Sequence, residues 1–265
     1  MQAALFITCL TDTFYPRVGV ALVRVLRHFG WDVVLPRGQT CCGQPAFNSG
    51  AHSDARPLAR RMVALFADQP HVVTPSASCA AMFTHHYAEL LGSDPVWGPR
   101  ATALAGRTKE CMTFLRDVVG VDVSAHLRFD EPVTFHFSCH ARDAYGPADL
   151  ERWLAAVPGI DLRPPQQRDL CCGFGGVFAV EFPEISGAML DDKLADLAAT
   201  GARLVICNEG GCGLHLTGGA ARQRTPLRFK HLVECLAESL GLLRPDELVT
   251  PAEPCDCATG AGTPA

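Results

Sequence analysis

The feature that most constrains this chain is a cysteine pattern that occurs twice. Cys41-Cys42-Gly43 follows Cys9, and Cys171-Cys172-Gly173 follows Cys139 at the same interval. All three cysteines of the first copy are therefore separated from their counterparts by one constant offset, which is about half of the chain. A repeat of this length predicts an internal duplication in which each half is one structural unit.

Each copy is completed by one further cysteine. Cys79 lies in the segment 75–82, and Cys212 lies in the segment 210–215 at nearly the same offset. A structural cysteine behaves as a small buried hydrophobe and needs no fixed spacing. A metal ion or iron–sulfur cluster does require a defined spacing of cysteines, because several thiolates must converge on one centre. We therefore predict two four-thiolate sites, one made by Cys9, Cys41, Cys42 and Cys79, the other by Cys139, Cys171, Cys172 and Cys212.

The composition indicates a soluble globular protein. Of 265 residues, 48% are hydrophobic and 19% are charged, with a net charge of -5, so nothing favours binding to nucleic acid. No run of 18 apolar residues is present, and the N-terminal segment lacks the basic residues and cleavage site of a signal peptide. Thirteen cysteines without an export signal point to the reducing cytoplasm and to metal binding rather than disulfides.

Apolar runs and amphipathic stretches alternate in both halves. In the first half, strands are expected at 3–10, 31–36 and 71–75, with helices between them. The second half repeats this order, with strands at 133–139, 160–162 and 203–207 and a helix over about 183–199. Each half is expected to close with a helix, from Lys109 in the first and from His231 in the second. Such alternation predicts a parallel sheet flanked by helices, with ligands at the carboxyl edge of the strands. We expect an α/β fold of two similar tandem domains, 1–128 and 129–248, followed by a disordered low-complexity tail, 249–265, which contains Cys255 and Cys257.

Several residues near the quartets are secondary candidates. Cys207 directly follows its expected strand, whereas Cys79 and Cys212 lie several residues beyond theirs, so Cys212 is the predicted ligand and Cys207 a neighbour or alternate. His215, three residues after Cys212, is a further alternate, and His140 adjoins Cys139. Both histidines are more simply explained by packing. Two more cysteines, Cys111 and Cys235, each follow a glutamate in an expected helix and are interpreted as core residues.

Glycines next to each pair suit the chemistry of clustered thiolates. Gly43 follows the first pair, and Gly173, Gly175 and Gly176 follow the second. Glycine lets the backbone approach closely, so that N–H groups can point at sulfur and offset its negative charge.

With these segments together, the chain resembles the cysteine-rich CCG-domain proteins, which include the cysteine-rich subunit of heterodisulfide reductase and the iron–sulfur subunit of glycolate oxidase. It is most similar to the stand-alone lactate-utilisation protein A group. The resemblance covers residues 1 to about 245. The stretches that carry it are Cys41–Gly50, Pro75–Cys79, Ser138-Cys139, Cys171–Gly176 and Glu184–Met189. The pattern departs from the fullest family form, because Met82 and His215 stand where a fifth cysteine would complete Cys-x-x-Cys.

The resemblance implies an iron–sulfur electron-transfer subunit with two [4Fe-4S] clusters, acting with two partner subunits in the oxidation of L-lactate or another 2-hydroxy acid. The residues alone lead only to a duplicated thiolate site. They leave open a scaffold with structural zinc, and a thiol–disulfide reductase like the heterodisulfide reductase relatives. No dinucleotide or flavin fingerprint is present, and no catalytic residue is identifiable.

Overall fold

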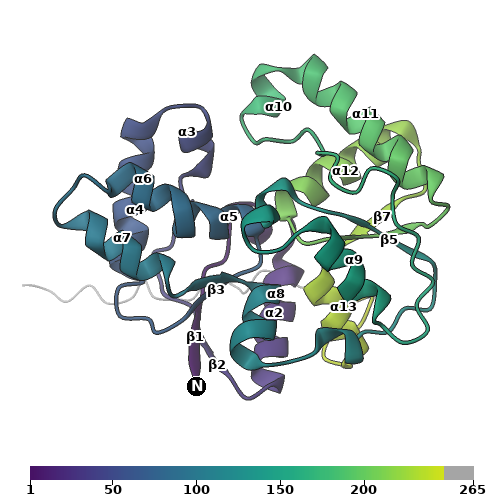
Figure 1. The fold of residues 1–265 in the computed structure, drawn as a ribbon, viewed down its shortest axis with the longest axis horizontal. Helices are drawn as coiled ribbons and strands as arrows, with labels where there is room; N and C mark the ends of the chain where they lie inside the picture. The colour runs from purple at the N-terminus through teal and green to yellow at the C-terminus, as the bar shows by residue number, and fades with distance from the viewer. Residues whose placement is uncertain (248–265) are drawn as a thin grey trace, which may run out of the picture.

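The structure, a computed structural model, describes residues 1–247 (Figure 1). The predicted tail and its Cys255 and Cys257 lie outside these residues. The elements of the first half are β1 (Gln2–Leu5), α1 (Cys9–Phe14), α2 (Pro16–His28), β2 (Asp32–Val34), α3 (Gln44–Asn48), α4 (His52–Leu65), β3 (Val72–Thr74), α5 (Ala77–Ala81), the π-helix η1 (Met82–His86), α6 (Tyr87–Leu91), α7 (Trp97–Ala105), β4 (Thr108–Glu110), α8 (Cys111–Phe114), the π-helix η2 (Leu115–Val119) and the 3₁₀-helix η3 (Val123–Ala125).

The second half repeats much of this order. Its elements are β5 (Val133–His136), the 3₁₀-helix η4 (Cys139–Asp143), α9 (Pro147–Ala155), α10 (Phe178–Glu181), α11 (Pro183–Ala199), β6 (Leu204–Cys207), α12 (Gly210–Gln223), β7 (Arg228–Lys230) and α13 (Leu232–Ser239). No helix in residues 1–247 is long and apolar enough to cross a membrane.

Each half forms its own parallel sheet, which confirms the expected fold class. The strand order is β2-β1-β3-β4 in the first sheet and β5-β6-β7 in the second. In the second sheet the counterpart of β2 is reduced to a single parallel bridge between Val133 and Leu162. The strand expected at 160–162 is therefore only this bridge.

Two strands were missed by the sequence analysis. The helix expected from Lys109 begins only at Cys111, because Thr108–Glu110 is strand β4. Likewise His231 caps α13, and the preceding Arg228–Lys230 is strand β7. Both strands are three residues long and contain charged side chains, so they carry no apolar run that would indicate a strand.

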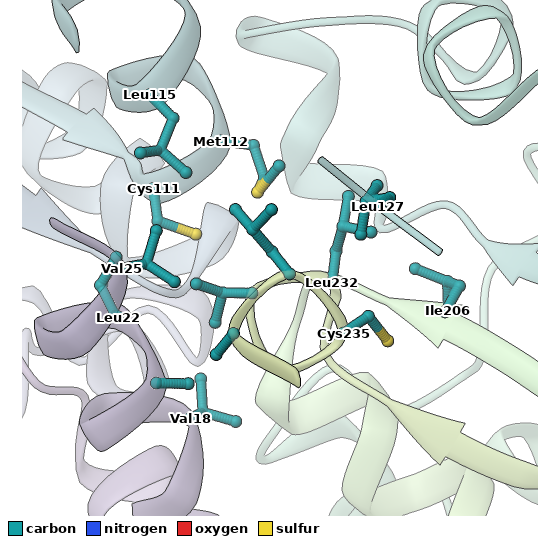
Figure 2. Close-up of a cluster of buried hydrophobic side chains, with 14 of the residues drawn as sticks. Val18, Leu22, Val25, Cys111, Met112, Leu115, Leu127, Ile206, Leu232 and Cys235 are labelled. Carbon is teal, nitrogen blue, oxygen red and sulfur yellow. The ribbon is translucent and has the colours of Figure 1, made fainter. Parts of the chain in front are cut away.

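The two halves share one hydrophobic core. Alternation along the strands sends Ala3 and Leu5 of β1, and Val133 and Phe135 of β5, into this core. Helices α2 and α13 pack side by side between the sheets (Figure 1). Figure 2 shows α13 surrounded by side chains of α2, α8 and β6, with Cys111 and Cys235 among the apolar groups. These two cysteines are buried, as expected for core residues.

The opposite faces of the sheets carry separate cores. Ala4, Phe6 and Val72 belong to a cluster covered by α4, α6 and α7, while Val205 and Cys207 belong to a cluster covered by α11 and α12. Both of these clusters include cysteines of the predicted quartets. The cysteine sites thus lie on the outer faces, away from the shared core.

Candidate metal centres

The first predicted quartet is assembled from three separate segments. Cys9 opens α1, directly after β1, and Cys79 lies in α5, directly after β3. Cys41 and Cys42 lie in the loop after β2. Since β1, β2 and β3 are parallel neighbours, their carboxyl ends meet at one edge of the sheet. The topology therefore gathers all four cysteines at that edge.

The four sulfurs of this quartet interact in a chain. Cys42 Sγ lies 3.3 Å from Cys79 Sγ. Cys41 accepts hydrogen bonds from the thiols of Cys42 and Cys9, and these lower the pKa of Cys41 to about 3. The pKa of Cys9 is raised by the same hydrogen bond and by burial. One cysteine is thus stabilised as a thiolate, which is the form that binds metal.

The second quartet repeats this arrangement. Cys139 opens η4 after β5, Cys212 lies in α12 after β6, and Cys172 Sγ lies 3.1 Å from Cys212 Sγ. Hydrogen bonds from Cys139 and Cys172 lower the pKa of Cys171 to about 2. The lowest pKa therefore falls on the first cysteine of the adjacent pair in both halves. In the second quartet the hydrogen bond with Cys172 also lowers the pKa of Cys212, to about 6.

A backbone amide points at each of these thiolates. Gly43 N–H donates to Cys41 Sγ and Gly173 N–H donates to Cys171 Sγ, each at 3.4 Å. Both glycines are in the left-handed region, with φ of 88° and 83°. A Cβ on Gly173 would also lie 2.7 Å from the carbonyl oxygen of Ser186. The turn therefore requires glycine, and glycine directs a donor at the charged sulfur.

The secondary candidates lie around the second quartet. His215 Nε2 is 3.3 Å from Ser186 Oγ, and burial lowers the pKa of His215. Cys207 Sγ donates to the carbonyl oxygen of Glu209 at 3.3 Å, and burial raises the pKa of Cys207. His140 Nδ1 lies 3.5 Å from Cys139 Sγ. His215 and Cys207 thus have polar partners of their own, and His140 contacts the edge of the quartet.

His136 was not singled out by the sequence analysis. It is the last residue of β5, and a ring nitrogen of His136 and the sulfurs of Cys172 and Cys212 all lie within 4.8 Å of one another. Its sequence context, an apolar run ending in Cys139, is typical of a plain strand. The sequence signal that could have identified His136 is the constant offset between the halves. By that offset, His136 corresponds to Phe6 in the first half.

Glu209 was also missed, and it connects the two halves. As the residue capping α12, it accepts from Gly211 N–H, and its carboxylate also accepts from Ser76 Oγ at 3.0 Å and from Ser78 N–H at 2.8 Å. Ser76 in turn caps α5, accepting from Cys79 N–H. Ser76 and Glu209 have the same separation in the sequence as Cys79 and Cys212, so equivalent caps of the two cysteine-bearing helices bond to each other.

The donor set fits a thiolate-bound metal centre. Each quartet offers four sulfurs, at least one of them stabilised as a thiolate, together with a backbone donor that offsets the charge of the first cysteine of the pair. Soft sulfur donors in this number select zinc or an iron–sulfur cluster. The arrangement can therefore hold a redox cluster or a structural ion in each half.

Comparison with known proteins agrees with the duplication. The model of the CCG cysteine-rich domain family matches twice, over residues 3–84 and 133–217. The chain belongs to this cysteine-rich (CCG) domain family. Within it, the chain is 42% identical over 240 residues to a protein of Halalkalibacterium halodurans named "Lactate utilization protein A", covering 89% of this chain and 96% of that protein.

Further relatives carry related names. A Bacillus cereus protein named "Lactate utilization protein A 2" is 39% identical over 241 residues, covering 91% of this chain and 99% of the relative. A Bacillus anthracis protein named "Lactate utilization protein A 1" matches to the same extent. At these coverages the similarity extends over both halves of the chain.

Proposed function

We propose that this chain is an iron–sulfur electron-transfer subunit of a multi-subunit system that oxidises L-lactate or a similar 2-hydroxy acid. The observation that carries the proposal is the pair of matched quartets, each with a stabilised thiolate and a glycine N–H directed at it. The names of relatives that are 42% and 39% identical supply the link to lactate utilisation.

In this proposal Cys9, Cys41, Cys42 and Cys79 hold one centre and Cys139, Cys171, Cys172 and Cys212 the other. Bound [4Fe-4S] clusters would supply one-electron transfer. The protein positions the thiolates, offsets their charge through Gly43 and Gly173, and keeps the inner cysteines, Cys42 and Cys172, away from water at 2% exposure each. The bond between Glu209 and Ser76 fixes the two cysteine-bearing helices relative to each other.

Partner proteins are part of the proposal. Taking two electrons from a hydroxy acid usually requires a flavin or nicotinamide carrier, and the sequence has no fingerprint for either. We infer that two partner subunits complete the system and that the reaction takes place in the cytoplasm.

The sulfur distances favour a second candidate, a structural zinc ion in each site. Sulfurs bonded to one ion at ~2.3 Å lie within about 4 Å of each other, and the inner sulfur pairs, at 3.3 and 3.1 Å, satisfy this limit. In that case the chain would be a scaffold subunit and would carry no electrons.

The test is anaerobic purification followed by iron, sulfide and zinc analysis and by turnover assays. Brown protein with iron and acid-labile sulfide in both sites supports the proposal, whereas colourless protein with one zinc per site favours the scaffold. The iron-loaded chain should oxidise L-lactate with an artificial acceptor only after its partner subunits are added. Rapid turnover by the chain alone would refute the electron-transfer role.

A further inference from the structure

The imidazole of His136 is buried and has no hydrogen bond of ordinary geometry. The residue is 1% exposed, and neither Nδ1 nor Nε2 has a hydrogen-bond partner of acceptable geometry. Buried polar groups are nearly always paired, because an unpaired one costs free energy relative to water. The imidazole interacts with the Cys212 sulfur, but sulfur is a weak hydrogen-bond partner, so an imidazole at this depth calls for a stronger partner such as a metal ion.

The surroundings of this imidazole are sulfur. Alternation along β5 sends Phe135 into the shared core and His136 to the opposite face. There a ring nitrogen lies within 4.8 Å of both Cys172 Sγ and Cys212 Sγ, which lie 3.1 Å apart. Both sulfurs are buried, so these three donors converge at the inner end of the second quartet.

The first half offers the natural comparison. Phe6 occupies the equivalent position, at the same offset as the paired cysteines, and is fully buried in the cluster that also contains Cys42 and Cys79. Its ring packs against Phe66 and Phe83, with centroids 6.0 and 4.8 Å away. The first quartet therefore has a hydrocarbon ring where the second has a nitrogen donor.

We propose that His136 is a nitrogen ligand of the metal centre at the second cysteine quartet, where it takes the place of one of the four thiolates, and that the two centres of this protein consequently have different ligand sets. The inference rests on the proposed metal-binding function. Imidazole is a good ligand for iron and zinc alike, and histidine in place of thiolate changes the reduction potential of an iron–sulfur centre. Two centres of unequal potential would give electron transfer through the chain a preferred direction.

The experiment detects directly whether a histidine nitrogen coordinates the second metal centre. The protein is produced with ¹⁵N only in histidine, loaded with iron and sulfide, and purified as the Cys42→Ser variant so that only the second centre forms. Pulsed electron paramagnetic resonance of the reduced centre should show strong ¹⁵N hyperfine coupling. The mirror variant, Cys172→Ser, retains only the first centre and should show none.

Variants then assign the nitrogen. His136→Phe, which copies the first half, should abolish the coupling. The double variant His140→Gln/His215→Gln leaves His136 untouched and should retain the coupling, so the assignment stands even where His136→Phe assembles poorly. Iron-loaded protein without coupling, or coupling that survives in His136→Phe, would overturn the inference.

Metal analysis separates this result from a failure of the proposed function. If the sites hold zinc and no iron, the electron-transfer proposal fails, but the ligand question is still answered by X-ray absorption at the zinc edge. The Cys42→Ser variant should then show a nitrogen scatterer that is lost on His136→Phe. An all-sulfur zinc shell in the Cys42→Ser variant would overturn the inference on this route as well.

Discussion

The two cysteine quartets share their scaffold but differ in what lies against them. In both halves a glycine N–H points at the first cysteine of the pair. The second cysteine of the pair contacts the fourth cysteine of the quartet, with Sγ atoms 3.3 Å apart in the first half and 3.1 Å apart in the second. Behind the first quartet lie the rings of Phe6 and Tyr87, with Tyr87 Oη donating to the carbonyl oxygen of Cys42 at 2.8 Å. Behind the second lies the imidazole of His136.

This comparison shows which parts of the duplicated site vary. The thiol donors and the turn that presents them are repeated, whereas the groups next to them have changed. The groups around a metal centre tune its potential and its access to water. A duplicated fold can therefore give two centres with the same cysteines and different properties.

The largest expected effect tests which cysteines complete the second quartet. Cys212→Ser should remove about half of the bound iron, because loss of one thiolate ligand abolishes a site. Cys207→Ser, the matched control at the end of β6, should leave the iron content nearly unchanged, since Cys207 donates to the Glu209 carbonyl oxygen. Iron and sulfide analysis of both variants decides the matter. The opposite pattern would make Cys207 the ligand and break the equivalence of Cys79 with Cys212.

The next expected effect is a pH dependence of folding stability that arises from His231, a residue that joins the two halves. His231, in the second half, contacts the carbonyl oxygen of Pro75 in the first half at 3.0 Å, and burial lowers the pKa of His231 to about 4. The unfolded chain has an ordinary histidine pKa of about 6.5, so it binds a proton in the range where the folded chain does not. Stability from this group is complete above a pH of about 6.5 and is lost as the pH falls toward about 4, by at most about 3 kcal/mol.

Urea unfolding at a series of pH values measures this slope. His231→Gln keeps a polar side chain but removes the titration, so its stability should depend less steeply on pH between about 4 and about 6.5. If the variant and the natural chain lose stability in parallel over that range, another group is responsible.

A somewhat smaller effect is expected for the link between equivalent helices. Glu209→Ala removes the cap of α12 and leaves Ser76 and Ser78 without their acceptor. Hydrogen bonds to a charged group contribute about 1.5–3 kcal/mol, so we expect a loss of about 2–3 kcal/mol in the free energy of unfolding. Ser76→Ala, which leaves the Glu209 cap on α12 in place, should cost only about 1 kcal/mol.

Denaturant titration of both variants gives these values. A loss of only about 1 kcal/mol for Glu209→Ala would mean that the contact between the halves contributes little, and that Glu209 acts only as a local helix cap.

The repeated elements were predictable from the sequence, whereas the differences between the halves were not. The gathering of each cysteine quartet at one sheet edge was predictable from the repeated spacing and the alternation of strands and helices, and α2 and α11 from their apolar faces. That these cysteines bind metal remains a prediction. Strands β4 and β7 were not predictable, because each is a short edge strand stabilised by pairing with an inner neighbour. His136 and Glu209 act through contacts with distant segments, which no local pattern reveals. The domain limits at 128 and 248 remain predictions.

The smallest expected effect tests whether Cys111 and Cys235 are core residues and not metal ligands. Cys111 and Cys235 lie in the shared core, 0% and 4% exposed, among side chains from both halves (Figure 2). Burial raises the pKa of both thiols, which disfavours the thiolate needed for metal binding. Replacing either cysteine with alanine should cost about 1–2 kcal/mol, through lost packing around a small cavity, and should leave the iron content unchanged. Denaturant titration and iron analysis of Cys111→Ala and Cys235→Ala measure both quantities. A loss of iron in either variant would show that the replaced cysteine contributes to a metal centre. The two quartets would then not contain all of the cysteine ligands.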